Sequence, residues 1–222
     1  KSSAGLLILG VSNSYSGGTQ VNGGTLQIGA DISPGATAGG LLRDAGGSAT
    51  TARLAPARSI IRRVVLLGPA HRVPIRGLAL PVAEAFATPL GGVPIDAEDA
   101  RAALALPQVS ASDVAHNLEH SLEVQLPFLQ TVLDDFTLLP FAVGAATPTQ
   151  VAEVLDLLWG GPETLILISS DLSHFHTYAS AQDIDQGTVG EILALEPSIE
   201  HEQACGATPI NGLLLCARRR GM

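Results

Sequence analysis

Three aliphatic runs in the second part of the chain have the pattern of buried β-strands. They are IIRRVVLLG (60–68), TLLPFAV (137–143) and TLILISS (164–170). None of them alternates apolar with polar residues, as a strand with one solvated face does. The sequence therefore predicts a sheet whose central strands are covered on both faces.

Helical spacing occupies the segments around these strands. In LEHSLEVQLPFLQTVL (118–133) leucines recur at intervals of three and four, and we expect Pro127 to kink or split that helix. The other predicted helices are 147–160, 178–195 and 207–220. Strands alternating with helices predict an α/β domain with a mostly parallel or mixed sheet and helices on both faces.

Polar residues follow two of the predicted strands directly. His71 comes just after the first strand, and Asp171 and His174 come just after the third. In sheets of this kind, ligands bind at the carboxyl ends of the strands. We therefore expect a site at this edge, although a histidine in such a position is often only a hydrogen-bonded structural residue.

The first 59 residues differ in composition from the rest. They hold half of the 24 glycines, and their basic residues outnumber their acidic ones although the whole chain has a formal charge of −9. We predict a Gly-rich tail or linker over 1–59 and an α/β domain over 60–222. Within the tail, NSYSGGTQVNGGTLQIG (13–29) alternates β-formers with turn residues, and residues 5–29 resemble an autotransporter passenger repeat. A stable β-helix needs about three such rungs, so a surface-displayed β-helix fragment is the weakest functional alternative.

Charge and composition argue against several classes of protein. A net charge of −9 disfavours binding to nucleic acid or to anionic membranes. No apolar run reaches the ~18 residues of a membrane-spanning helix, and the first residues lack the features of a signal peptide. Because Cys205 and Cys216 are the only cysteines, we expect reduced thiols and a cytoplasmic protein.

Two further segments carry residues that could ligate a metal. In HNLEHSLE (116–123), His116 and His120 are four apart, but the zincin signature has glutamate directly after its first histidine, where this chain has Asn117. We reject a metalloprotease, and the structural alternative is a solvated helix start with its charged residues facing outward. In ACGATP, Cys205 precedes a predicted helix, whose N-terminus would stabilise a thiolate. Cys216 lies within that helix and is predicted to pack.

Four motifs together resemble one family. They are LLGPAH (66–71), EHSLEVQLPFL (119–129), SSDLSH (169–174) and ACGATPI (204–210). Their order and spacing resemble the Memo family, whose bacterial members are often called AmmeMemoRadiSam system protein B. The resemblance covers about residues 62–220 and implies a fold similar to the class III extradiol dioxygenases, which cleave catechol rings with non-haem Fe(II).

The resemblance implies a set of site residues. The metal positions of the family match His71, His120 and Cys205, the acid/base histidine matches His174, and the carboxylate near it matches Asp171. The ring-cleaving enzymes use a carboxylate as third ligand, and a cysteine in its place makes the site softer. The expected cofactor is therefore a redox metal, Fe(II) or copper, with zinc a further candidate.

The chain departs from the family pattern at both ends. Family members begin with a strand ending near PHAGYxYSG, whereas LLILGVSNSYSGG (6–18) has Ser12 and Asn13 in the histidine region. The chain also stops at CARRRGM, where the family continues to another strand. We therefore expect a partial domain that lacks the first strand and the C-terminal end, with exposed sheet edges.

The candidate site residues and the resemblance are consistent with two functions. The first is a metal-dependent redox or oxygenase-like activity on an unknown small molecule. The alternative is a non-catalytic binding module that recognises a peptide or a partner protein through the same pocket. The resemblance implies a radical-SAM protein as a partner.

Overall fold

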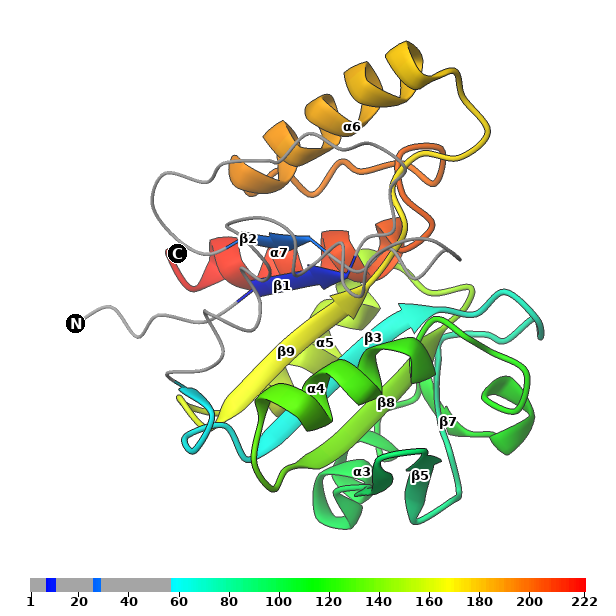
Figure 1. Cartoon of the computed structure of the whole chain (residues 1–222), viewed down its shortest axis with the longest axis vertical. Coiled ribbons are helices and arrows are strands. Elements are labelled where there is room, and N and C mark those ends of the chain that lie inside the picture. The colour runs from blue at the N-terminus through cyan, green and yellow to red at the C-terminus, as the bar shows by residue number, and fades with distance from the viewer. Residues whose placement is uncertain (1–6, 11–25, 29–56) are drawn as a thin grey trace.

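A computed structural model of the chain describes residues 7–10, 26–28 and 57–222. The described residues form a seven-stranded sheet in the order β2-β1-β9-β3-β8-β4-β7 (Figure 1). Its strands are β1 (Leu7–Gly10), β2 (Leu26–Ile28), β3 (Arg63–Pro69), β4 (Leu78–Leu80), β7 (Val109–Ala111), β8 (Thr137–Val143) and β9 (Thr164–Ser169). Every neighbouring pair is parallel except β4 with β8. The predicted α/β class with a mostly parallel sheet is confirmed.

The other elements connect and cover these strands. A hairpin of β5 (Ala85–Thr88) and β6 (Gly91–Pro94) forms a separate two-stranded sheet. The helices of the described residues are α3 (Ala97–Ala103), α4 (Leu126–Val132), α5 (Pro148–Leu158), α6 (Tyr178–Leu193) and α7 (Ala207–Arg219), and the short 3₁₀ helices are η2 (Asp113–Ala115) and η3 (Glu123–Gln125). No helix in this part of the chain is long and apolar enough to cross a membrane.

The three predicted strands and three of the four predicted helices are confirmed. The exception is the segment 118–133, where the α-helix begins only at Leu126 and the preceding residues form turns and η3. Pro127 lies in the first turn of α4, where its missing N–H leaves no hydrogen bond unmade, so it starts the helix instead of kinking it. The elements between 78 and 115 were not predicted, because they are short and weakly periodic.

Side chains of β3 alternate between two cores. Val65 and Leu67 pack with α5 and α7, whereas Val64 and Leu66 pack with α4. Figure 1 shows α4 in front of the sheet and α5 behind it. This arrangement explains the aliphatic run without polar alternation, because both faces of the strand are dry.

The far edge of β9 is not open. β1 lies along it in parallel register, and β2 lies beyond β1. The sequence predicted an exposed sheet edge, and β1 covers that edge at β9. The rest of residues 1–56, including most of the repeat-like stretch 13–29, lies outside the described residues.

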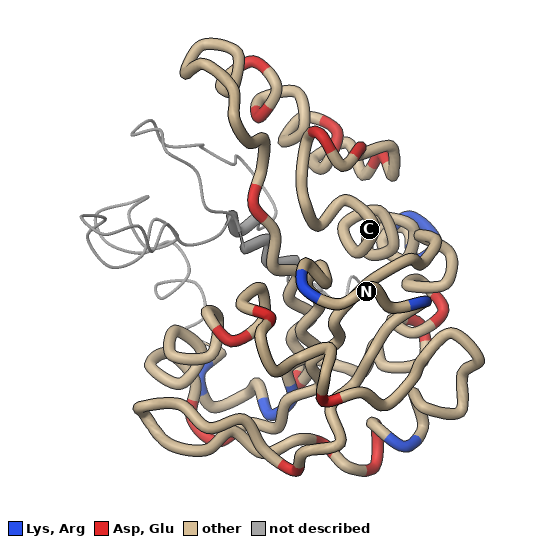
Figure 2. Tube along the Cα trace, turned by 90° about the vertical axis from the view of Figure 1, so that its right-hand side faces the viewer, with Lys and Arg blue, Asp and Glu red and all other residues tan. Residues whose placement is uncertain are grey.

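Charged residues are spread along the described part of the chain. Acidic residues outnumber basic ones by 21 to 12 in the sequence. Figure 2 shows both kinds distributed along the described part of the trace, without a continuous basic stripe, and shows several acidic residues on the segment around α6.

Replacement of Phe141 by alanine should lower the free energy of unfolding by about 3–5 kcal/mol, because Phe141 is fully buried at the centre of β8. Urea unfolding followed by circular dichroism measures the change. The control is Leu118→Ala, at a residue that is 69% exposed, and its cost should stay within about 0.5 kcal/mol. Equal costs for the two variants would contradict the assignment of the core.

Candidate functional site at the carboxyl edge of the sheet

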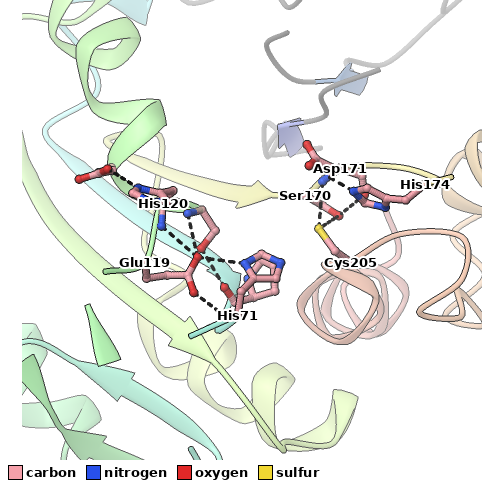
Figure 3. Close-up of polar contacts among 10 residues, drawn as sticks. His71, Glu119, His120, Ser170, Asp171, His174 and Cys205 are labelled. Carbon is pink, nitrogen blue, oxygen red and sulfur yellow. Dashed lines mark hydrogen bonds and ion pairs between the residues drawn. The ribbon is translucent and has the colours of Figure 1, made fainter. Parts of the chain in front are cut away.

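The site begins where two adjacent strands end. β3 and β9 are parallel neighbours, so their carboxyl ends share one edge of the sheet. His71 follows β3, and Asp171 and His174 follow β9 (Figure 3). Cys205 joins them from the loop before α7, where its backbone N–H donates to the Asp171 carbonyl oxygen at 3.2 Å. The structure thus brings four of the five sequence-predicted site residues to this edge.

Glu119 is the buried centre of the His71 side of the site. Its side chain is only 2% exposed. One carboxylate oxygen lies 3.0 Å from His71 Nδ1, and the other accepts a hydrogen bond from the His71 backbone N–H. With the proton on Nδ1, the Nε2 of His71 is the nitrogen left to face other groups.

The loop that follows Glu119 completes its hydrogen bonding. The backbone N–H groups of His120 and Ser121 donate to Glu119 Oε1 at 3.0 and 3.1 Å. Burial opposes ionisation of Glu119, but these donors and His71 outweigh it and lower the pKa of the carboxyl. The sequence predicted the charged residues here on a solvated helix face. For Glu119 that prediction is wrong, because the segment is not helical and folds its carboxylate inward.

Close contact with the end of β3 holds the Glu119 loop in place. Ser121 Oγ donates to the Pro69 carbonyl oxygen at 2.8 Å. A Cβ added at Gly68 would lie 2.8 Å from Ser121 Oγ, so the loop could not approach β3 this closely with a larger residue there.

Cys205 is held by the end of β9. Its Sγ accepts a hydrogen bond from the Asp171 backbone N–H at 3.2 Å and lies 3.7 Å from Ser170 Oγ. Ser170 Oγ also donates to the Asp171 carbonyl oxygen and accepts from the Gly206 backbone N–H, each at 2.8 Å. A Cβ at Gly206 would come within 2.6 Å of Ser170 Cβ, so glycine permits this packing.

His71 interacts with both halves of the site. The interaction with Cys205 contributes most to raising the pKa of His71 to about 9, Glu119 adds to it, and burial opposes both. At neutral pH the ring is therefore an imidazolium between a carboxylate and a cysteine sulfur. Such a ring can donate a hydrogen bond from each of its two nitrogens. If Nε2 loses its proton, the lone pair on that nitrogen can coordinate a metal ion.

His120 does not join this group. Its side chain is 64% exposed, and its Nδ1 lies 2.7 Å from Glu123 Oε1. Figure 3 shows its ring directed away from His71 and Cys205. In the part of the chain that the structure describes, no group of three or more His, Cys, Asp or Glu side chains is arranged to hold a metal ion.

The other two candidate residues, His116 and Cys216, each donate a hydrogen bond to a backbone carbonyl oxygen. His116 Nε2 donates to the Ala79 carbonyl oxygen at 3.1 Å, and burial lowers the pKa of its ring. Cys216 Sγ donates to the Ala152 carbonyl oxygen at 3.2 Å, and burial raises the pKa of its thiol to about 12. The prediction that Cys216 packs inside the helix is confirmed.

His174 lies at the solvent-facing side of the site. Its Nε2 is 3.4 Å from Asp171 Oδ2, and the two side chains are 42% and 46% exposed. The carboxylate can orient the ring, and the exposure leaves the ring able to exchange protons with water or a bound ligand.

Sequence reasoning gave no role to Glu119 and Ser170, which hold the site together. A signal for Glu119 was present, because it directly precedes His120 in the motif EHSLE. For Ser170, the only signal in the sequence was its position at the end of a buried strand. Neither signal says that the side chain turns inward.

The sequence is similar to two kinds of protein in different segments. The family described as "Memo-like protein" matches residues 47–219, and the one described as "Passenger-associated-transport-repeat" matches residues 1–28. A MEMO1 family protein of Methanosarcina mazei is 34% identical over 173 residues, which cover 71% of this chain and 63% of that protein. A MEMO1 family protein of Methanopyrus kandleri is 34% identical over 178 residues, covering 71% and 61%. The chain thus spans less than two thirds of these relatives.

One solved structure is similar at a lower level. It is an uncharacterized protein of Escherichia coli K12, with a TM-score of 0.46 and 15% sequence identity over 75% of this chain and 78% of that chain.

Replacement of Glu119 by alanine should lower the free energy of unfolding by about 3 kcal/mol. The substitution leaves several backbone N–H groups without the buried carboxylate that now accepts their hydrogen bonds. Urea unfolding at pH 7 measures the loss. Glu123→Ala is the matched control, since that side chain is 54% exposed, and we expect a change within about 0.5 kcal/mol. A similar, small effect in both variants would count against the buried Glu119.

The stability of the metal-free protein should fall as the pH rises from 6.5 towards 9. A folded-state pKa of about 9 for His71, above its ordinary value of 6.5, means that the folded protein binds more protons than the unfolded chain in this window. The stabilisation is complete below pH 6.5 and is lost through pH 9. Urea unfolding between pH 6 and 9.5 with chelator should show a shallower slope in His71→Gln than in the wild type. Identical slopes would refute the assignment.

Proposed function

Because this chain belongs to the Memo-like protein family, we propose that its sheet-edge site supports a metal-dependent redox or oxygenase-like reaction on a small molecule. The observation that supports the proposal most is the meeting of His71 and Cys205, which lie far apart in the sequence. An imidazole and a thiolate are suitable donors for Fe(II), copper or zinc.

The described residues fit the expected metal site only in part. His71 and Cys205 face the same space, whereas His120 faces Glu123. The set of three ligands that the sequence predicted is therefore not assembled, and a bound ion would rely on His71 and Cys205. Such an ion would supply Lewis acidity or electron transfer to the site.

Glu119 has the role of a partner that orients a ligand. Its contact with His71 Nδ1 keeps the proton on that nitrogen and sets the direction of the ring. A carboxylate in this position also increases the basicity of Nε2 and is a common companion of metal-bound histidine.

Asp171 serves the site through two different groups. Its backbone N–H donates to Cys205 Sγ and stabilises negative charge on the sulfur. Its carboxylate orients His174, which we propose as the residue that moves a proton between the bound small molecule and solvent.

Metal binding tests this proposal. The protein, loaded anaerobically with Fe(II), Cu(I) or Zn(II) and desalted, should retain close to one equivalent of one of these ions by elemental analysis. His71→Ala and Cys205→Ala should each weaken binding at least tenfold, on the order of the loss of a ligand or its partner. His176→Ala and Cys216→Ala are the controls of matched residue type and should bind as the wild type does. Equal, substoichiometric metal in all five proteins would refute the proposal.

The alternative is a binding module that recognises a peptide or partner protein without turnover. The absence of a three-donor group among the described residues favours it. A co-expressed radical-SAM protein should then co-purify equally with the wild type and with His174→Ala, in both cases without bound metal. Loss of the partner in His174→Ala alone would argue against a purely passive surface.

A further inference from the structure

The ring of Phe175 stands fully in water beside the site. The residue is 105% exposed, as open to solvent as in an extended peptide. It lies in the connection between β9 and α6, which Figure 1 shows at the periphery of the molecule. Its ring centroid is 5.9 Å from that of His174. Packing within the fold therefore gives no reason for a large apolar side chain at this position.

The backbone of Phe175 is unusual as well. Its φ of 61° lies in the left-handed region, which is costly for a bulky residue. Among the described residues, Leu195 is the other non-glycine with a positive φ, and it offers a comparison. Leu195 directly follows α6, where this conformation commonly ends a helix, and its side chain packs against the core. Phe175 precedes α6 and its ring is unpacked, so neither reason applies to it.

The segment that carries Phe175 is strongly acidic. Residues 171–217 contain none of the 12 Lys and Arg residues of the chain. They contain seven of its 21 acidic residues, which are Asp171, Asp183, Asp185, Glu191, Glu196, Glu200 and Glu202. Figure 2 shows several of these in red around α6. Charge of one sign on a surface attracts ligands of the opposite sign.

We infer that residues 173–178 and α6 form an interaction surface for a basic amphipathic segment of a partner protein, with Phe175 as the apolar anchor. A ring this exposed cannot line a pocket of its own chain, so the apolar surface that buries it belongs to the partner. Tyr178, three residues further on, is 56% exposed and adds a second aromatic ring. Phenylalanine and tyrosine are enriched at the centre of protein interfaces. The acidic surroundings favour Lys and Arg at the rim of the partner's apolar surface.

The same charge argues against other occupants of this surface. A second copy of the chain would bring like charges together, and nucleic acid or an anionic membrane would be repelled. The surface also differs from a module that binds peptides in the site pocket, because its anchor projects into solvent.

Docking on Phe175 has a consequence for the site. Because the Phe175 and His174 rings are neighbours, a bound partner would also cover His174, whose side chain is 42% exposed. Exchange of protons between His174 and water would then slow. This regulatory effect rests on the proposed function, whereas the surface itself does not. The test below therefore uses metal-free protein, and its failure is distinct from a failure to bind metal.

Binding of a model peptide to the full chain tests the inference. The probe is a fluorescein-labelled amphipathic helix of leucine and lysine, measured by anisotropy, and the reference peptide has glutamate in place of lysine. The wild type should bind the lysine peptide alone, more weakly as the ionic strength rises from about 0.05 to 0.3 M. Phe175→Ala should weaken binding about tenfold, as expected for an interface anchor. Leu90→Ala, at a 59% exposed residue of the β5–β6 hairpin, is the matched control and should bind as the wild type does.

The inference is overturned if the wild type does not bind the lysine peptide, or if Phe175→Ala binds it equally well. A charge reversal gives an independent check. Asp183→Lys, at an exposed residue of α6, should weaken binding several-fold more than Glu98→Lys, at an exposed residue of α3. Equal weakening would indicate attraction to the net charge alone and would overturn the assignment of the surface.

Two further measurements distinguish the other occupants. Sedimentation of the wild type and Phe175→Ala detects self-association, and flotation with phosphatidylcholine vesicles detects membrane binding. Neither should depend on Phe175. Self-association or vesicle binding that is lost in Phe175→Ala would overturn the inference in favour of a second copy or a membrane.

Discussion

The parallel pairing of β3 with β9 is the constraint on which the site depends. It places the carboxyl ends of two strands side by side, so that His71 and the Ser170–Asp171 pair leave the sheet at the same edge. Helices on both faces bury the middle of each strand, and the polar residues can therefore gather only where the strands end. Cys205 reaches this edge because its loop is hydrogen-bonded to the end of β9.

A second requirement is the buried carboxylate of Glu119. An ionised carboxylate away from water is costly unless several donors surround it. His71 and the two backbone N–H groups that follow Glu119 provide those donors, and the pKa of Glu119 stays below its usual value. The same contacts orient the His71 ring towards Cys205. The His71 side of the site is thus ordered by hydrogen bonds within the protein.

The sheet also shows how a segment from outside the Memo-like match can become part of its structure. A lone repeat rung has too little apolar surface to fold by itself. A parallel sheet edge offers both hydrogen-bond partners and a neighbouring core, and two short strands of the repeat-like segment lie there. The strand that pairs with this segment, β9, is also the strand that leads into Asp171.

Local patterns in the sequence determined much of the fold and some of the site. Aliphatic runs predicted β3, β8 and β9, helical spacing predicted α5, α6 and α7, and four ordered motifs identified the family. The rule that ligands gather at strand ends placed His71, Asp171 and His174 at one edge. These features depend on neighbours close in sequence, or on a topology that strand and helix alternation implies.

Only the tertiary structure decided which side chains of the loops turn inward. Leucine spacing around residues 118–125 predicted a helix, but packing of Ser121 against the end of β3 and the hydrogen bonds to Glu119 favour a turn. That turn buries Glu119 and leaves His120 facing Glu123, an outcome opposite to the sequence-based expectation for both residues. The position of β1 was likewise beyond the sequence, because register and partner depend on an edge formed by residues more than 150 positions away. Contacts between distant segments determine the direction of the loops and the pairing of the strands. Local periodicity in the sequence therefore does not predict them.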